Sequence, residues 1–190
     1  MTRGSARELA MHLIYSRNFT GEDPRQAVRA RIEQEYYANL ADENEIYADM
    51  PTRKQVKYLD QVVAGVMEEE EALNGIIAKY AIGWDISRIS RLSRAIMQLA
   101  IYEIIHFEDV PDNVAVSEAV RLTKLYDTDS AAFVNGILGS YVRARKEEPV
   151  APIEEAPVAP VEEAPVTEEA PAVEEPAAET EEVSYECNRL

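Results

Sequence analysis

Cysteine is almost absent from this chain of 190 residues, whose only one is Cys187. A single cysteine excludes an intramolecular disulfide and a zinc site built on cysteine pairs. Long apolar runs are missing too: no stretch approaches the roughly 20 apolar residues of a membrane helix, and the N-terminus has no apolar run of signal-peptide length. These absences predict a soluble protein of the reducing cytoplasm.

Residues typical of catalytic or metal centres are also scarce. His12 and His106 each stand in a helical pattern without a second histidine or a cysteine nearby, which favours packing or surface roles over catalysis or metal binding. Neither Ser130 nor Ser140 follows a nucleophile-elbow pattern, and the seven glycines form no phosphate-binding loop. The sequence therefore predicts no catalytic site, no metal site and no cofactor.

Positive charge is nearly absent from the end of the chain. Of the formal net charge of −17, residues 147–190 contribute −13, from fourteen glutamates and Arg189. This segment also holds seven of the ten prolines, and it has too little apolar surface to offset the entropy of ordering. We therefore expect a disordered acidic tail over 147–190, after a folded domain over 1–146.

Apolar residues with helical spacing fill the expected domain. The central stretch, residues 84–107, predicts one buried helix with a cationic beginning, because Arg88, Arg91 and Arg94 recur every third residue and the later turns are apolar nearly all round. No segment alternates with the period of a strand. The pattern predicts an all-α bundle of six or seven helices in two sub-bundles.

Turn and capping residues set the expected boundaries of the other helices. A capping box of Ser5 and Glu8 predicts the start of the first helix, and Asp23 before Pro24 predicts the start of the second. The third helix is long enough for a kink at Gly65 or Gly75. The expected ranges are 5–19, 24–47, 52–80, 114–126 and a last helix through Tyr141, capped by Asp129 or Ser130.

Four sequence blocks follow one another at characteristic spacings in the second half of the domain: RLSRAIMQLAIYEI (91–104), DVP (109–111), VAVSEAVRLTKLY (114–126) and above all FVNGIL (133–138). Together with the opening SARELAMHLIYS (5–16), these blocks resemble the NusB family of bacterial transcription antitermination factors. The resemblance covers residues 3–145. It implies a fold of two helical sub-bundles that meet at an angle.

The resemblance also implies partners and a function without catalysis. Family members pair with the ribosomal protein NusE, and the heterodimer binds the single-stranded boxA element of nascent ribosomal RNA and helps RNA polymerase read through terminators. The implied partners are therefore boxA RNA, NusE and an RNA polymerase elongation complex with other Nus factors. A homodimer of the free protein is an open alternative.

Site residues follow from the positions that match the family. Single-stranded RNA is held by cationic contacts to phosphates and by bases stacked on aromatic rings. The positions implied to bind RNA are Arg3, Arg7, Tyr80, Asp129 and Phe133, although Phe133 fits a core role equally well. The positions implied near the protein partner are Tyr15, Ser93, Ala100 and Glu103, whereas Tyr102 is expected in the core. Glu118 is either a further partner contact or a helix-surface charge, and we favour the surface charge.

The sequence departs from the family in its opening and in its tail. Only Arg3 and Arg7 stand where relatives have several consecutive basic residues, which predicts weaker, less salt-dependent RNA binding. Ser93 replaces an acidic residue that is frequent in relatives. One alternative hypothesis stays open, a protein-interaction module with weak RNA binding. A third hypothesis, the RNA-binding appendage of an RNA methyltransferase, is disfavoured because it needs a catalytic domain after residue 146, where the sequence has only the tail.

The acidic tail allows two interpretations. Its glutamates could fold back on the basic residues of the domain and compete with RNA phosphates, or attract the basic ribosomal partner. Alternatively, the tail is a solubilising linker without contacts, which is the interpretation we favour.

Overall fold

The described part of the chain is helical throughout. The computed structural model describes residues 1–41 and 44–147, and these ranges contain no strand. The expected tail therefore lies outside the described residues, except for Glu147. The helices are α1 (Arg3–Thr20), α2 (Pro24–Arg31), α3 (Gln34–Ala41), α4 (Arg53–Glu68), α5 (Glu70–Tyr80), α6 (Arg91–His106), α7 (Asp112–Tyr126) and α8 (Ala131–Glu147), with 3₁₀ turns η1 (Glu45–Tyr47), η2 (Ile86–Arg88) and η3 (Thr128–Ser130).

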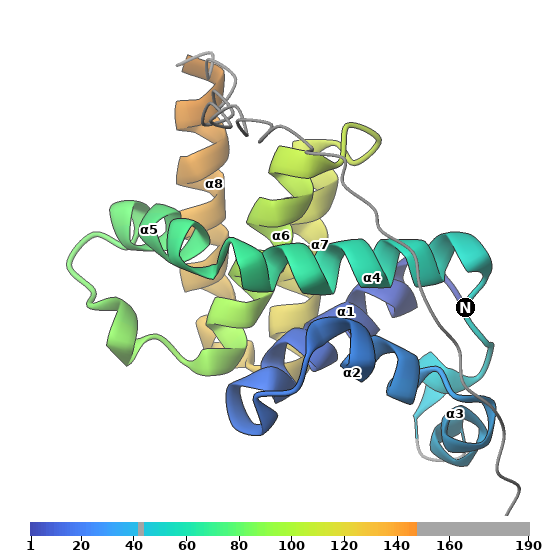
Figure 1. The fold of residues 1–190 in the computed structure, drawn as a ribbon. Coiled ribbons are helices and arrows are strands. Elements are labelled where there is room, and N and C mark those ends of the chain that lie inside the picture. Colours follow the sequence, from blue (N-terminus) through green and yellow to red (C-terminus); the bar gives the residue numbers. More distant parts are fainter. Residues whose placement is uncertain (42–43, 148–190) are drawn as a thin grey trace, which may run out of the picture. The chain divides into compact units, whose positions relative to one another are not determined.

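Helix α6 is the centre of the fold, as the sequence predicted. It packs against α1 and α4 and also against α5, α7 and α8, and Figure 1 shows α4 crossing in front of α6 and α7. The first four helices form one sub-bundle and the last four form the other. The all-α class is confirmed, but the described residues contain eight α-helices rather than six or seven.

A glycine permits the close crossing of α4 and α6. Gly65 is buried in α4, and a Cβ atom added there would collide with the ring and hydroxyl of Tyr102 on α6. Tyr102 is buried, as expected for a core residue. A larger side chain at this position would therefore require Tyr102 or one of the two helices to shift.

The first helix begins earlier than its predicted capping box. Thr2, rather than Ser5, is the N-cap, because the Ser5 N–H donates to Thr2 Oγ1 at 3.0 Å. The carboxylate of Glu8 is instead buried and accepts from the Tyr126 hydroxyl at 2.7 Å. The predicted capping box was wrong because the carboxylate of Glu8 is engaged in this tertiary contact with Tyr126.

The predicted second helix is divided into α2, α3 and η1. Its start is confirmed, since Asp23 Oδ1 accepts from the Gln26 N–H at 3.0 Å. The helix ends at Arg31 because the chain must turn to bury Tyr37, whose hydroxyl donates to the carbonyl of Asp49 at 2.9 Å. The rings of Tyr37 and Tyr47 then meet edge to face, 5.1 Å apart.

The predicted third helix breaks at Glu69, and neither predicted kink, at Gly65 or at Gly75, is the break. Glu69 stands within a run of four glutamates, where like charges weaken a continuous helix. Two of these residues, Glu70 and Glu71, fall in the first turn of α5, where carboxylates favour the positive end of the helix dipole. The break also lets Glu69 Oε1 pair with His106 Nε2 at 2.9 Å.

The central helix begins at Arg91, not at Trp84. Ser90 caps it by accepting from the Ser93 N–H at 3.0 Å, and the preceding residues form a turn and η2. Arg88 therefore belongs to η2, and the expected cationic ladder of Arg88, Arg91 and Arg94 does not run along one helix. None of the helices in the described part has the length and apolar character to cross a membrane.

Candidate nucleic-acid interface

Arg7 lies inside the protein rather than on a basic surface. Its side chain is 4 % exposed, and its Nε donates to both carboxylate oxygens of Glu103 at 2.8 and 2.9 Å. The Tyr58 hydroxyl donates to the same carboxylate at 3.0 Å. Burial alone would lower the pKa of Arg7, but the charge of Glu103, its hydrogen bond and the neighbouring Tyr58 and Glu118 together raise this pKa. Arg7 thus joins α1 to α6 as a buried ion pair.

Arg3, one turn earlier, is on the surface. Its guanidinium pairs with Asp109 at 3.0 Å, and both side chains are more than half exposed. Exposed ion pairs of this kind contribute at most about 1 kcal/mol, so a phosphate group can displace Asp109. Arg3 and Arg7, which the sequence grouped together, therefore have different environments and different roles.

Two hollows along α4 gather further cations, and we call them together the α4 groove. The first, of about 570 Å³, is lined by Arg3, Lys54, Lys57 and one carboxylate, Asp109. The second, of about 510 Å³, lies toward α2 and brings in Arg25 and Arg29. It also has two carboxylates, Asp60 and Glu68.

The two hollows are adjacent, because Lys57 and Gln61 line both. Lys54 and Lys57 lie one turn apart in α4, and nothing in the sequence places them beside Arg3. The link is tertiary, since Gln55 Nε2 donates to the carbonyl of Met1 at 2.8 Å and holds the N-terminus beside the start of α4. Figure 1 shows the N-terminus beside the beginning of α4.

Aromatic side chains gather around the end of α5 and the start of α8, and we define Tyr80, Trp84 and Phe133 as the aromatic corner. The Trp84 and Phe133 rings lie 5.3 Å apart, and the Tyr80 ring meets Tyr141 at 5.8 Å. Phe133 is half-buried, which is compatible with both expected roles, RNA contact and core packing. Asp129 is exposed in η3, just before α8.

The predicted RNA residues thus fall into two groups rather than one. Arg3, in α1, lies beside the beginning of α4. The aromatic corner instead follows α5, beyond the opposite end of α4 (Figure 1). Trp84 was not among the predicted site residues. Its signal was already present in the sequence, as the chain's single tryptophan directly after Gly83.

Most of the predicted partner residues are internal. Ser93, Ala100 and Glu103 are at most 2 % exposed. Ser93 donates from its hydroxyl to Asp127 Oδ2 at 2.8 Å, and Ser90 donates to the same oxygen at 3.0 Å. Burial would raise the pKa of Asp127, but hydrogen bonds from Ser93, Ser130 and Ser90 lower it overall. Ser93, Ala100 and Glu103 therefore stabilise the position of α6 and are not exposed for contact with a partner.

Tyr15 is the one predicted partner residue near an open surface. It is half-buried, and its ring meets that of Phe19, which is 62 % exposed, at 5.2 Å. The guanidinium of Arg91 stands 5.1 Å from the centre of the Phe19 ring. Tyr15, Phe19 and Arg91 form what we call the α1 patch, and exposed aromatic and arginine side chains of this kind are typical of protein interfaces.

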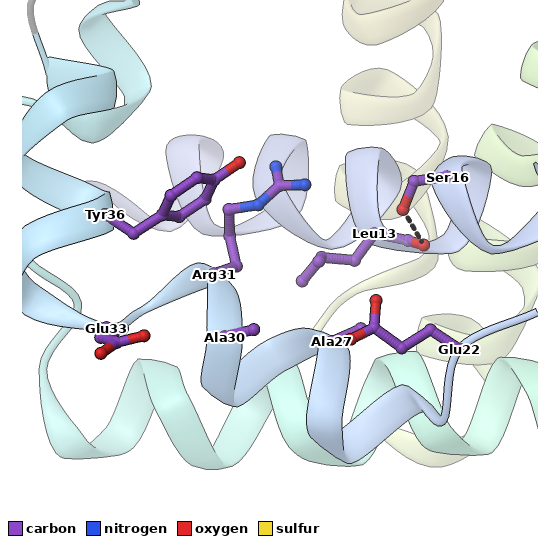
Figure 2. A pocket seen from close by; sticks show the side chains of 8 residues that line it. All are labelled: Leu13, Ser16, Glu22, Ala27, Ala30, Arg31, Glu33 and Tyr36. Atoms are coloured by element: carbon purple, nitrogen blue, oxygen red, sulfur yellow. Dashed lines mark hydrogen bonds between the residues drawn. The ribbon is translucent and has the colours of Figure 1, made fainter. Parts of the chain in front are cut away.

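A third hollow, of about 260 Å³, lies between α1 and the α2–α3 segment. Figure 2 shows Arg31 and Tyr36 on one side of it and Leu13 and Ser16 on α1. Its lining has one arginine, Arg31, and two glutamates, Glu22 and Glu33, and Arg31 also donates to the Tyr47 hydroxyl at 2.9 Å. This balance of charge does not favour a phosphate, and none of the predicted site residues lines the hollow.

The described residues contain no group of three or more histidine, cysteine, aspartate or glutamate side chains arranged to hold a metal ion. They instead offer a cationic groove and an aromatic corner. Phosphate groups suit the groove, and flat unsaturated rings suit the corner. The fold and these surfaces define an all-helical binding module with separate cationic and aromatic elements.

This chain belongs to the NusB family, whose model matches residues 4–143. A transcription antitermination protein NusB from Symbiobacterium thermophilum is 40 % identical over 147 residues, which cover 77 % of this chain and 92 % of the relative. The corresponding protein of Acetivibrio thermocellus is 38 % identical over 146 residues, covering 76 % and 91 %.

Solved structures support the same fold. The NusB of T. maritima has a TM-score of 0.62 at 23 % identity, covering 75 % of this chain and 92 % of that one. A chain from the crystal structure of antitermination factors NusB and NusE in complex with dsRNA has a TM-score of 0.58 at 22 % identity, covering 75 % and 96 %. At these identities the likeness concerns the fold alone.

Proposed function

We propose that this chain is a transcription antitermination factor, which binds the boxA element of nascent ribosomal RNA together with NusE and promotes read-through by RNA polymerase. The family match over residues 4–143 carries the proposal. Relatives named as antitermination proteins and the fold of a NusB solved with NusE and RNA support it. The chain would act in the cytoplasm, beside other Nus factors, as an adaptor without a catalytic step.

The RNA-binding roles divide between the two surfaces. Arg3, Lys54 and Lys57 are proposed to hold phosphates along the α4 groove, since their exposed charges share one hollow. Tyr80 and Phe133 are proposed to contact bases, with Asp129 as a hydrogen-bond acceptor beside them. Arg7 is proposed to act indirectly, because its pairing with Glu103 fixes the helix that carries Arg3.

The α1 patch is the proposed contact for NusE. Its exposed Phe19 and the cation above it support this assignment, and Tyr15 contributes the edge of its ring. Ser93, Ala100 and Glu103 lie in α6 and are proposed to act by holding that helix in place.

The direct test is RNA binding measured by fluorescence anisotropy, with a boxA-like single strand and a scrambled strand, each with and without NusE. Selective binding that tightens when NusE is added is the expected result. A chain that binds neither RNA nor NusE would overturn the proposal and leave only the shared fold.

Substitutions in the groove sharpen this test. Arg3→Ala and Lys57→Ala should each weaken binding of both strands by a similar factor and reduce the slope of log affinity against log salt by about 0.7, the effect expected for one phosphate contact to a single strand. Arg143→Ala, which removes an exposed cation of α8 away from the groove, is the matched control. An unchanged salt slope in both groove variants would show that the α4 groove does not bind phosphates.

A protein-interaction module with weak RNA binding is the second candidate. The burial of Arg7 favours it, because only Arg3 of the two opening arginines remains available for phosphates. In the same anisotropy experiment, this function would appear as a stable NusE complex without preference for the boxA-like strand.

A further inference from the structure

Trp84 is the only tryptophan of the chain, and it is 55 % exposed. Ile82, two residues before it, is 89 % exposed. Large apolar side chains that stand together in water are a feature of binding surfaces, because a monomeric fold gains stability by covering them. This turn between α5 and η2 therefore has a surface that its own fold does not explain.

The turn holds Trp84 in a defined position. Gly83 adopts a positive φ of 80°, and the Trp84 N–H donates to the carbonyl of Ala81 at 2.9 Å. Asp85 fixes the other side, since its Oδ1 accepts from the Ser87 N–H at 2.8 Å and from the Ser87 hydroxyl at 2.7 Å. The indole is therefore presented from a backbone that is already ordered, which lowers the entropic cost of binding.

Phe133 supports the indole from one side. The two rings lie 5.3 Å apart with an angle of 58° between their planes. Phe133 is half-buried and packs against the hydrophobic core, so it anchors the pair to α8. The exposed part of Trp84 is left available for a third flat ring.

The charges around this corner select among the conceivable ligands. Lys79 and Arg88 contribute two exposed positive charges, and Asp85 and Asp129 contribute two exposed negative charges. A ligand recognised only by its phosphates would gain little from this balanced set. A ligand recognised by its flat ring gains from stacking whatever the local charge.

We infer that Trp84, backed by Phe133, is a stacking platform for an unpaired base of single-stranded RNA. The inference rests on the proposed RNA binding and assigns a residue that was not among the predicted positions. Tyr80, four residues before Trp84, ends α5, and the Lys79 ammonium stands 5.4 Å from the centre of its ring. The platform thus extends an aromatic surface that is already proposed to receive bases, which favours RNA over a protein partner.

The single tryptophan makes the test direct. Addition of boxA-like RNA should quench the fluorescence of Trp84, because a stacked base contacts the indole, whereas inorganic polyphosphate should not. In anisotropy experiments, Trp84→Ala should weaken RNA binding roughly tenfold, as expected for the loss of one stacked base, and Trp84→Phe should retain most of the affinity.

Tyr36→Ala is the matched control, since Tyr36 is 47 % exposed on α3, outside both proposed RNA surfaces. Its RNA affinity should equal that of the unchanged chain, and circular dichroism should show that every variant is folded. If the chain binds RNA but Trp84→Ala binds equally well, the platform is wrong while the proposed function stands. If Trp84→Ala loses NusE alone, the corner is a protein surface and the inference is overturned. If no form binds RNA, both proposals fail.

Discussion

The interior between α1 and α6 and the aromatic corner reverse the usual distribution of side chains. The interior encloses a cation and a carboxylate, Arg7 and Glu103, at most 4 % exposed. The corner leaves an indole 55 % exposed. Each arrangement costs free energy unless something compensates for it.

The difference between the two regions lies in where the compensation comes from. In the interior, Glu103 accepts hydrogen bonds from Arg7 and from Tyr58, so the charges satisfy each other within the fold. At the corner, Phe133 covers only part of Trp84, and the remainder has no partner in the described structure. Residue type alone therefore misleads, because a cation can be structural and an aromatic ring can be the functional group.

Glu103→Gln should produce the largest effect, because it leaves the buried Arg7 guanidinium without its nearest counter-charge, and Glu118 lies farther away at 3.9 Å. We expect a loss of about 3 to 5 kcal/mol in the free energy of unfolding, measured by urea denaturation. Against a typical total of about 5 to 15 kcal/mol, this loss would destabilise the domain severely.

The double variant Arg7→Met with Glu103→Leu is the control for this experiment. It removes both charges and keeps apolar volume, so it should be more stable than Glu103→Gln alone. A loss below about 1 kcal/mol for Glu103→Gln, the range of exposed pairs, would show that Arg7 is solvated and would restore it as a candidate phosphate ligand.

Gly65→Ala should have the next largest effect. The added methyl group meets the Tyr102 side chain, and overpacking of this kind costs about 1 to 3 kcal/mol, reduced by the gain of about 0.5 to 1 kcal/mol from replacing a helical glycine. The matched change is Gly75→Ala in α5, where nothing lies within 4 Å of the new atom. Urea denaturation should show a loss for the first variant and a small gain for the second, and equal effects would contradict the close crossing of α4 and α6.

The sequence predicted the parts of the fold that depend on neighbouring residues. The apolar later turns of α6, the Asp23–Pro24 start of α2 and the all-α class follow from spacing and capping. The break after Arg31 did not, because it depends on Tyr37 reaching Asp49 across a turn. The break at Glu69 was missed for a related reason, since a glycine is a visible helix breaker and a contact with His106 is not.

The candidate site shows the same limit. Arg3 and Arg7 are four positions apart and look equivalent, but Arg7 meets a carboxylate 96 residues away and Arg3 meets Asp109. The grouping of Lys54 and Lys57 with Arg3 likewise depends on the path of the N-terminus beside α4. Sequence patterns supplied the chemical types, and tertiary contacts decided which of them face water.

His12 stands between the two extremes and should give the smallest effect. It is half-buried, and its Nε2 lies 2.9 Å from the Tyr126 hydroxyl, which itself donates to Glu8. Burial lowers the pKa of His12 below its ordinary value of 6.5, although Glu8 opposes the shift. The unfolded chain therefore binds a proton more readily, so stability should fall as the pH decreases below 6.5.

His12→Gln keeps a donor toward Tyr126 but cannot be protonated, and urea denaturation between about pH 5 and 8 should show that it loses less stability on acidification. A steeper loss in His12→Gln would mean that the folded state prefers the protonated ring.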